Sequence, residues 1–193
     1  DNIANLRIAA GKKLAKNFPC DADIVVPIPE SGIFPAIGYS YQSGIPFVPA
    51  IIRNDNVDRT LFETDLENRI KMINSKLDVI DELVNDKNIV LIDEAILSGT
   101  TIINIISKLK YAGVKSIHIR IPFPIVGNPC KANCMPNTGM FLTEKIFSKD
   151  KLLDDITKSF ESYLDVFSVK FLSKNELLDC FQNPCEKCTN CIK

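Results

Sequence analysis

One stretch of the sequence alternates between strand-like and helix-like segments more clearly than any other. The continuous apolar run Asn88–Ile92 predicts a buried strand. A connecting loop, Asp93–Gly99, leads into a predicted helix over Thr100–Tyr111 that is closed by Gly113, and a further strand is predicted over Val114–Ile121. Because a strand–helix–strand unit of this length joins parallel strands, we expect an α/β fold with a mostly parallel sheet and helices on both faces.

The remaining chain repeats this alternation. The expected elements are a helix over Ile3–Asn17, a strand over Asp23–Pro29 that stops at prolines, a helix over Ile33–Tyr41 ended by Gly44, a strand over Ile45–Ile52, a mobile loop over Arg53–Thr64, a charged helix over Asp65–Leu77, an irregular segment over Val126–Gly139, two short helices after it, a short strand near Val169 and a helix from Lys174. We expect one main domain, residues 1–170, followed by a C-terminal helix and cysteine-rich tail, residues 171–193.

Charge and hydropathy exclude several classes of protein. The 23 basic and 24 acidic residues give a net charge of −1, and no long basic run is present, so we expect no nucleic acid as a partner. No apolar stretch approaches the roughly 20 residues that a membrane-spanning helix needs. A signal-peptide pattern is also absent, which predicts a cytoplasmic protein without a membrane partner. His118 is the single histidine and falls in an alternating strand pattern, so a packed histidine is favoured over a catalytic base.

The loop after the strand Asn88–Ile92 carries most of the candidate chemistry. Asp93 and Glu94 are adjacent carboxylates at the carboxyl end of a buried strand, where open α/β sheets bind ligands. The segment Ser98–Thr101 opens the next helix, and its free N–H groups and hydroxyls would hold a phosphate, with Gly99 allowing close approach. Ribose hydroxyls and hydrated Mg²⁺ would reconcile the acids with the phosphate. Taken alone, a Ser-Gly-Thr-Thr segment more often only caps a helix; the preceding acid pair favours phosphoribosyl binding.

With these motifs the sequence resembles the type I phosphoribosyltransferases, and within them the C-terminal domain of the glutamine 5-phosphoribosyl-1-pyrophosphate (PRPP) amidotransferases. The loop Ala22–Gly32 is similar to the loop that meets pyrophosphate in that family, with Ser31 at the metal–substrate position. The segment Val57–Leu61 is similar to its flexible catalytic loop, and Arg59 is the cation that would face the leaving pyrophosphate. Lys76 lies beyond that loop, at a further substrate-binding position. The resemblance runs through nearly the whole chain and implies the type I phosphoribosyltransferase fold.

The same resemblance implies a reaction. The domain would bind Mg²⁺–PRPP and transfer the phosphoribosyl group to ammonia, releasing pyrophosphate, as in purine biosynthesis. Asp93 and Glu94 would hold the ribose and stabilise its cationic transition state, while Ser98, Gly99, Thr100 and Thr101 would anchor the 5-phosphate. Ser31, Asp93 and Glu94 would bind Mg²⁺, and no protein nucleophile is required. A glutaminase domain or subunit and a homo-oligomer are the implied partners.

Seven cysteines are present: Cys20 and Cys180 stand apart, and the other five are Cys130, Cys134, Cys185, Cys188 and Cys191. Cys185, Cys188 and Cys191 recur at three-residue spacing, and with Cys130 they could form a thiolate cage for zinc or an iron–sulfur cluster, which the spacing favours about equally. The family resemblance implies a structural [4Fe–4S] cluster on Cys130, Cys188 and Cys191, with Cys185 or Cys134 as a possible fourth ligand. Cys20 and Cys180 are expected to be ordinary buried or half-buried thiols.

Several positions depart from the family pattern. Glu94 stands where the family has a second aspartate, and Ser98 where it has an arginine. In the catalytic loop Asn56 and Asp58 replace a tyrosine and a glycine, and an acid at position 58 would repel pyrophosphate. No glutaminase segment and no N-terminal cysteine nucleophile are present in the sequence. These departures leave a second hypothesis: a catalytically altered homologue that binds PRPP or a nucleotide, or uses a different acceptor.

Overall fold

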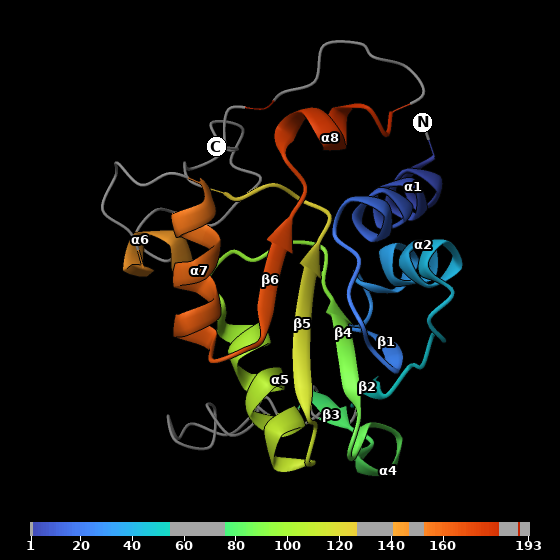
Figure 1. The fold of residues 1–193 in the computed structure, drawn as a ribbon, viewed down its shortest axis with the longest axis vertical. Coiled ribbons are helices and arrows are strands. Elements are labelled where there is room, and N and C mark those ends of the chain that lie inside the picture. Colours follow the sequence, from blue (N-terminus) through green and yellow to red (C-terminus); the bar gives the residue numbers. More distant parts are fainter. Residues whose placement is uncertain (1, 55–75, 127–140, 147–152, 182–188, 190–193) are drawn as a thin grey trace, which may run out of the picture.

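The computed structural model describes residues 2–54, 76–126, 141–146, 153–181 and 189 (Figure 1). Its elements are α1 (Ile3–Asn17), β1 (Ile24–Pro27), α2 (Ile33–Ser43), β2 (Ile51–Arg53), β3 (Leu77–Val79), α4 (Asp81–Val84), β4 (Asn88–Ile92), α5 (Thr100–Tyr111), β5 (Ser116–Ile121), α6 (Leu142–Ile146), α7 (Leu153–Leu164), β6 (Ser168–Phe171) and α8 (Lys174–Leu178). A four-stranded sheet has the order β1-β4-β5-β6, with every neighbouring pair parallel. The predicted parallel sheet is confirmed.

Alternate side chains of the strands pack into different layers on the two faces of this sheet. Val25 and Val90 pack with α1 and α2, and Tyr39 and Leu14 complete that cluster. On the other face, the strand residues Ile24, Val26, Ile89 and Leu91 pack with side chains of α5 and α7, namely Ile102, Ile105, Leu109 and Phe160. Figure 1 shows α1 and α2 together beside β1, and α7 beside β6. Helices therefore cover both faces, as the near-continuous apolar strands require.

Two sequence predictions around the small sheet were wrong. Ile45–Ile52 was expected to be one strand, but only Ile51–Arg53 pairs with β3, and Phe47 makes a single bridge to Val25. Pro46 and Pro49 lack the N–H groups that a continuous ladder needs, which explains the break. Leu77 was expected to end a helix; it begins β3 instead, because it pairs with Arg53 in an antiparallel ladder. Residues 65–75 of that expected helix lie outside the described residues.

Most other helices match their expected bounds. α1 begins after Asn2, whose side chain accepts hydrogen bonds from the N–H groups of Ala4 and Asn5. α2 ends at Gly44, which takes the left-handed conformation with φ 76°. α7 spans 12 residues and is longer than the short helix expected there. α8 begins as predicted, with a capping box between Ser173 and Glu176.

Described residues of the C-terminal segment pack on α1. Lys13 pairs with Asp179 at 2.6 Å, and the Asn17 side chain donates to Glu176 at 2.6 Å. The expected division at residue 170 stays a prediction, as does the cysteine-rich tail. Among the described residues, no helix is both long and apolar enough to cross a membrane.

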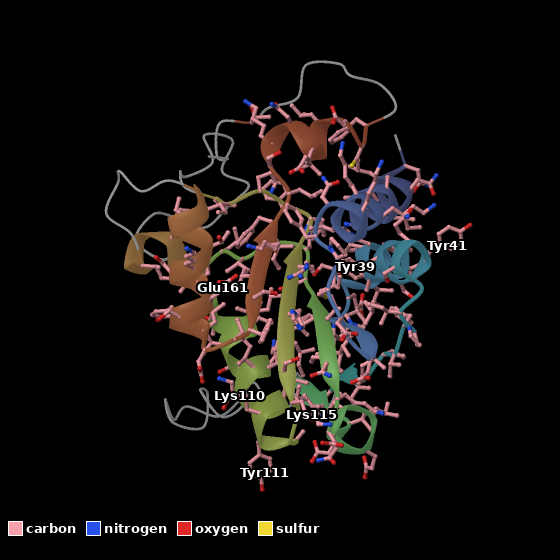
Figure 2. The ribbon with its side chains drawn as sticks, viewed as in Figure 1. Tyr39, Tyr41, Lys110, Tyr111, Lys115 and Glu161 are labelled. Carbon is pink, nitrogen blue, oxygen red and sulfur yellow. The ribbon has the colours of Figure 1, made fainter. Side chains whose placement is uncertain are left out.

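Two tyrosines of α2 illustrate how the helix period divides inside from outside (Figure 2). Tyr39 is fully buried and its hydroxyl donates to the carbonyl of Phe18 at 3.1 Å, whereas Tyr41 is 78% exposed.

His118 is packed, as predicted: it is 6% exposed, its Nδ1 lies 2.9 Å from Ser168 Oγ, and burial lowers its pKa. Cys20 and Cys180 are half-buried, also as expected.

α1 and α2 approach each other backbone to backbone. A Cβ added to Gly11 would lie 2.0 Å from the carbonyl oxygen of Pro35, and one added to Gly38 would lie 2.1 Å from that of Ile8. The two glycines thus meet the backbone of the opposite helix reciprocally. This close packing fixes the position of α1 relative to the sheet, because α2 also contacts β1 and β4.

We expect Gly38→Ala to destabilise the fold by about 3 kcal/mol, because neither backbone can yield the space for a methyl group without moving a helix. Urea unfolding of the purified protein would measure this change. Gln42→Ala is the matched control: it is an exposed position on the same helix and should change stability by less than about 0.5 kcal/mol. Equal stabilities for the Gly38→Ala variant and the wild type would contradict the backbone contact.

Candidate functional site

Two loops meet at the carboxyl edge of the sheet. In the parallel ladder of β1 and β4, Pro27 lies opposite Ile92, so the residues that follow each strand leave the sheet side by side. Ser31 Oγ donates to Asp93 Oδ1 at 3.3 Å, and the N–H of Glu94 donates to the same oxygen at 2.7 Å. The sequence-predicted residues Ser31, Asp93 and Glu94 are therefore brought together by the strand register.

Asp93 is the most buried acid of the site, with 9% of its surface exposed. Burial raises its pKa to about 6, because a carboxylate loses hydration in this environment. The hydrogen bonds from the Glu94 N–H and from Ser31 oppose that rise in pKa, and the charge of Glu94 adds to it. Such a carboxylate gains most from a ligand that supplies hydroxyl donors or positive charge.

Glu94 is held by a residue that the sequence analysis missed. Arg7 of α1 donates to Glu94 Oε1 through Nε at 2.9 Å and also through Nη2. The two residues are 87 positions apart, and no local pattern marks Arg7 as part of the site. The side chains of Arg7 and Glu94 keep 27% and 36% of their surface exposed, so the ion pair borders solvent.

The predicted phosphate loop forms the N-terminus of α5. Gly99 precedes the helix with φ 77°, a conformation that glycine adopts without strain, and the Ser98 hydroxyl accepts a hydrogen bond from the Thr100 N–H at 3.4 Å. Ser98 Oγ and Thr100 Oγ1 lie 3.1 Å apart, so the two hydroxyls gather at the helix start. A hollow of about 190 Å³ is lined by the loop and first turn, from Asp93 to Ile102. The other N–H groups of this turn, the two hydroxyls and the positive helix end suit a phosphate.

A larger cleft of about 510 Å³ joins these parts. Ser31, Asp93 and Glu94 line one part of it, Thr100 and Thr101 another, and the basic residues Arg53 and Lys76 a third. Lys76 was predicted from the sequence. Arg53 and Asn104 were not, although Arg53 ends a strand and faces the cleft from the small sheet. The cleft thus combines acids, hydroxyls and cations, the set that an anionic sugar requires.

Some predicted residues cannot be placed. Arg59 and the cysteines Cys130, Cys134, Cys185, Cys188 and Cys191 lie outside the described residues. Within the described part of the chain, no cluster of three or more His, Cys, Asp or Glu side chains could hold a metal ion by itself.

The opposite end of the sheet carries surface ion pairs. Lys110, Tyr111 and Lys115 lie there, where the strands β4 and β5 begin (Figure 2). Lys110 pairs with Asp165 and Lys115 with Asp86 on the surface. Exposed pairs of this kind contribute little to stability.

Comparison with known proteins shows which family the chain belongs to. Residues 2–131 match the family described as phosphoribosyl transferase domain. The chain is 33% identical to the amidophosphoribosyltransferase of Methanocaldococcus jannaschii over 177 residues, which cover 92% of the chain and 36% of the relative. It is 34% identical to the amidophosphoribosyltransferase of Methanothermobacter thermautotrophicus over 179 residues, 93% of the chain and 36% of the relative.

Two solved structures of related enzymes are also similar to this chain. Glutamine PRPP amidotransferase from B. subtilis, complexed with ADP and GMP, superposes with a TM-score of 0.78 at 28% identity, covering 98% of this chain and 40% of that one. A structure described as the allosteric regulatory enzyme of purine biosynthesis gives a TM-score of 0.79 at 28% identity, covering 99% and 40%. The chain therefore spans a little over a third of the length of the relatives it matches. On the match to residues 2–131, the fold and the arrangement of the cleft, the chain belongs to the phosphoribosyltransferase family, with its similarity to the amidophosphoribosyltransferases.

Proposed function

We propose that this protein binds Mg²⁺–PRPP in the cleft and transfers the phosphoribosyl group to ammonia, releasing pyrophosphate. The observation that carries the proposal is the convergence, in one cleft, of the buried acid Asp93 with the open N-terminus of α5. The first suits ribose hydroxyls and the second a phosphate. The amidophosphoribosyltransferase relatives support the same reaction class.

The charges along the cleft fit the parts of PRPP in order. The 5-phosphate would accept hydrogen bonds from the N–H groups and hydroxyls of residues 98–101. The ribose would lie over Asp93 and Glu94, and the pyrophosphate would face Arg53 and Lys76. Arg59 is proposed as a further cation for the pyrophosphate, on the family resemblance.

The oxygen donors of the site fit magnesium. Ser31 Oγ lies 3.3 Å from Asp93 Oδ1, so a hydroxyl and a carboxylate converge beside Glu94. Mg²⁺ is commonly held by one or two carboxylates together with substrate phosphates and water, so a larger protein cluster is not needed. When bound, Mg²⁺ would offset the pyrophosphate charge and polarise its oxygens.

No protein nucleophile takes part in the proposed step. Ammonia attacks C1 of the ribose, a C–N bond forms, the C1–O bond to pyrophosphate breaks, and the excess proton passes to solvent. Asp93 and Glu94 lie where positive charge develops on the sugar ring, and their carboxylates stabilise it because they are already fixed in place. Arg53 and Lys76 receive the charge of the departing pyrophosphate.

Further parts of the proposal rest on the relatives and on sequence. Ammonia would come from a glutaminase domain or subunit, since one of the similar solved structures is a glutamine PRPP amidotransferase. We also propose a structural [4Fe–4S] cluster on Cys130, Cys188 and Cys191, with zinc as the alternative metal. A cytoplasmic homo-oligomer completes the proposal.

One observation favours a second function, a binding module without turnover. In the segment that resembles the family's catalytic loop, Asp58 would repel pyrophosphate. A module of this kind would bind PRPP or a nucleotide and leave the C1–O bond intact.

The test is a pyrophosphate-release assay on protein purified without oxygen, which preserves a cluster. We expect release that requires PRPP, Mg²⁺ and ammonium together, and that stops when EDTA removes the metal. Calorimetric titration with Mg²⁺–PRPP measures binding in parallel. Tight binding without release in the presence of ammonium would support the module, and neither binding nor release would contradict both functions. A broad visible absorbance would distinguish the iron–sulfur cluster from zinc.

A further inference from the structure

The ion pair between Arg7 and Glu94 links the first helix to the acid pair of the cleft. Both hydrogen bonds from Arg7, through Nε and Nη2, end on Oε1 of Glu94. Within the described part of the chain, Glu94 Oε2 accepts no hydrogen bond. Glu94 lines the cleft, so this second oxygen remains available to a ligand. From this geometry we infer that Arg7 is a positioning residue, which holds the Glu94 carboxylate in the orientation that meets the ribose.

A guanidinium suits this task better than an ammonium. Its donors form a rigid planar fork, and two of them converge on Glu94 Oε1, so they fix the position of that oxygen from two directions. Glu94 has one more methylene than aspartate and therefore more rotamers to restrict. Arg7 removes that freedom before a ligand binds. The entropy cost of ordering the Glu94 side chain therefore does not weaken substrate binding.

The backbone of α1 around Arg7 is itself held in place. Ile8, the next residue, presents its carbonyl oxygen to Gly38 of α2, and Gly11 one turn later meets Pro35. Because α1 is clamped to α2 at these two points, the guanidinium is presented from a rigid element. A carboxylate held from such an element stays close to its productive geometry.

Arg7 also supplies charge. Asp93 and Glu94 are adjacent in sequence and both line the cleft, so their like charges repel each other. Arg53 and Lys76 line the same cleft, where the proposed function assigns them to pyrophosphate. Among the described residues, Arg7 is the cation that forms an ion pair with Glu94, and it offsets the repulsion that would otherwise turn Glu94 away from Asp93.

The inference rests on the proposed function and is tested by steady-state kinetics on the whole protein. We expect Arg7→Gln to lower kcat/KM for PRPP by about 10- to 100-fold, the usual loss when a residue that orients a ligand-binding group is removed. Arg7→Lys should recover only part of the activity, since an ammonium lacks the fork. Lys13→Gln is the matched control: it removes a helix α1 ion pair, to Asp179, and should stay within about twofold of wild type.

A double-mutant cycle separates positioning from a structural role. Glu94→Gln alone should lower kcat/KM, and adding Arg7→Gln to it should cause little further loss, because Arg7 acts through Glu94. Losses that multiply in the double variant would overturn the inference, as would an Arg7→Gln variant that matches wild type. Thermal unfolding checks that each variant is folded. If the Arg7→Gln variant does not fold, the Arg7→Lys variant takes its place in the test. Wild-type protein with neither binding nor turnover of Mg²⁺–PRPP would overturn the proposed function itself, and the inference with it.

Discussion

Replacing Asp93 by Asn should lower pyrophosphate release from PRPP by at least about 100-fold and yet stabilise the metal-free protein above pH 6. The loss of activity follows because an amide cannot stabilise positive charge on the ribose, and fixed charges of this kind commonly contribute 10²- to 10³-fold, roughly. The gain in stability follows from the pKa of Asp93, which burial raises from 3.8 to about 6. Burying Asp93 in its ionised form lowers the free energy of unfolding, and the neutral Asn side chain avoids that loss.

The direction of the pH dependence follows from proton binding. With its pKa raised by folding, Asp93 binds its proton more tightly in the folded state than in the unfolded state. Its favourable contribution is complete below pH 3.8 and is lost as the pH rises towards about 6. A pKa difference of about two corresponds to about 3 kcal/mol, an upper limit for the advantage of Asn at pH 8.

Urea unfolding in EDTA at pH 8 and at pH 4 would measure the effect. The advantage of Asn over Asp should be clear at pH 8 and small at pH 4. Asp179→Asn, at the exposed acid that pairs with Lys13, is the matched control and should leave activity unchanged. An Asp93→Asn variant that is less stable than wild type at pH 8, or one that keeps full turnover, would contradict the account of this residue.

Gly99→Ala is the second substitution with a large expected effect. The residue has φ 77°, where an alanine is strained by about 1–2 kcal/mol, and its Cβ would lie 2.7 Å from Cδ2 of the buried Leu142. The loop must shift to relieve both conflicts, so the N–H groups at the start of α5 move away from their common focus. We expect a loss of about 2 kcal/mol in stability and about a 10- to 100-fold loss in affinity for Mg²⁺–PRPP.

Gly44→Ala is a closely matched control for this variant. Gly44 has φ 76° and ends α2, but a Cβ there would have no atom within 4 Å. It therefore shares the backbone strain of Gly99→Ala without the clash and away from the cleft. Calorimetric titration should find normal affinity in Gly44→Ala and weak affinity in Gly99→Ala. Equal affinities in the two variants would show that the conformation of Gly99 does not matter for phosphate binding.

Local patterns were enough to predict much of the fold. The apolar run of β4, the helix α5 and the termination of α2 at Gly44 each depend on neighbouring residues, and all were predicted at or close to their observed bounds. Leu77 was assigned to a helix, because the ladder that makes it a strand depends on Arg53, a residue far away in sequence. Pro46 and Pro49 were the local signal against one long strand, because proline has no N–H group for the ladder.

The candidate site shows the same division. Asp93, Glu94 and the Ser98–Thr101 loop follow a strand and open a helix, so their meeting at one edge of the sheet could be predicted from order alone. Arg7 could not be, because the Arg7–Glu94 pair depends on how α1 packs against α2 and the sheet. Arg53 reaches the cleft from the small sheet, whose position is likewise a result of tertiary packing.

The most direct test of the central claim is an NMR titration of the ¹⁵N-labelled protein with Mg²⁺–PRPP. The claim predicts saturable, Mg²⁺-dependent shifts of the backbone amides of Gly99, Thr100 and Thr101, together with those of Asp93 and Glu94. Shifts confined to other surfaces, such as the end of the sheet around Lys110 and Lys115, would contradict it. So would an absence of any Mg²⁺-dependent shift.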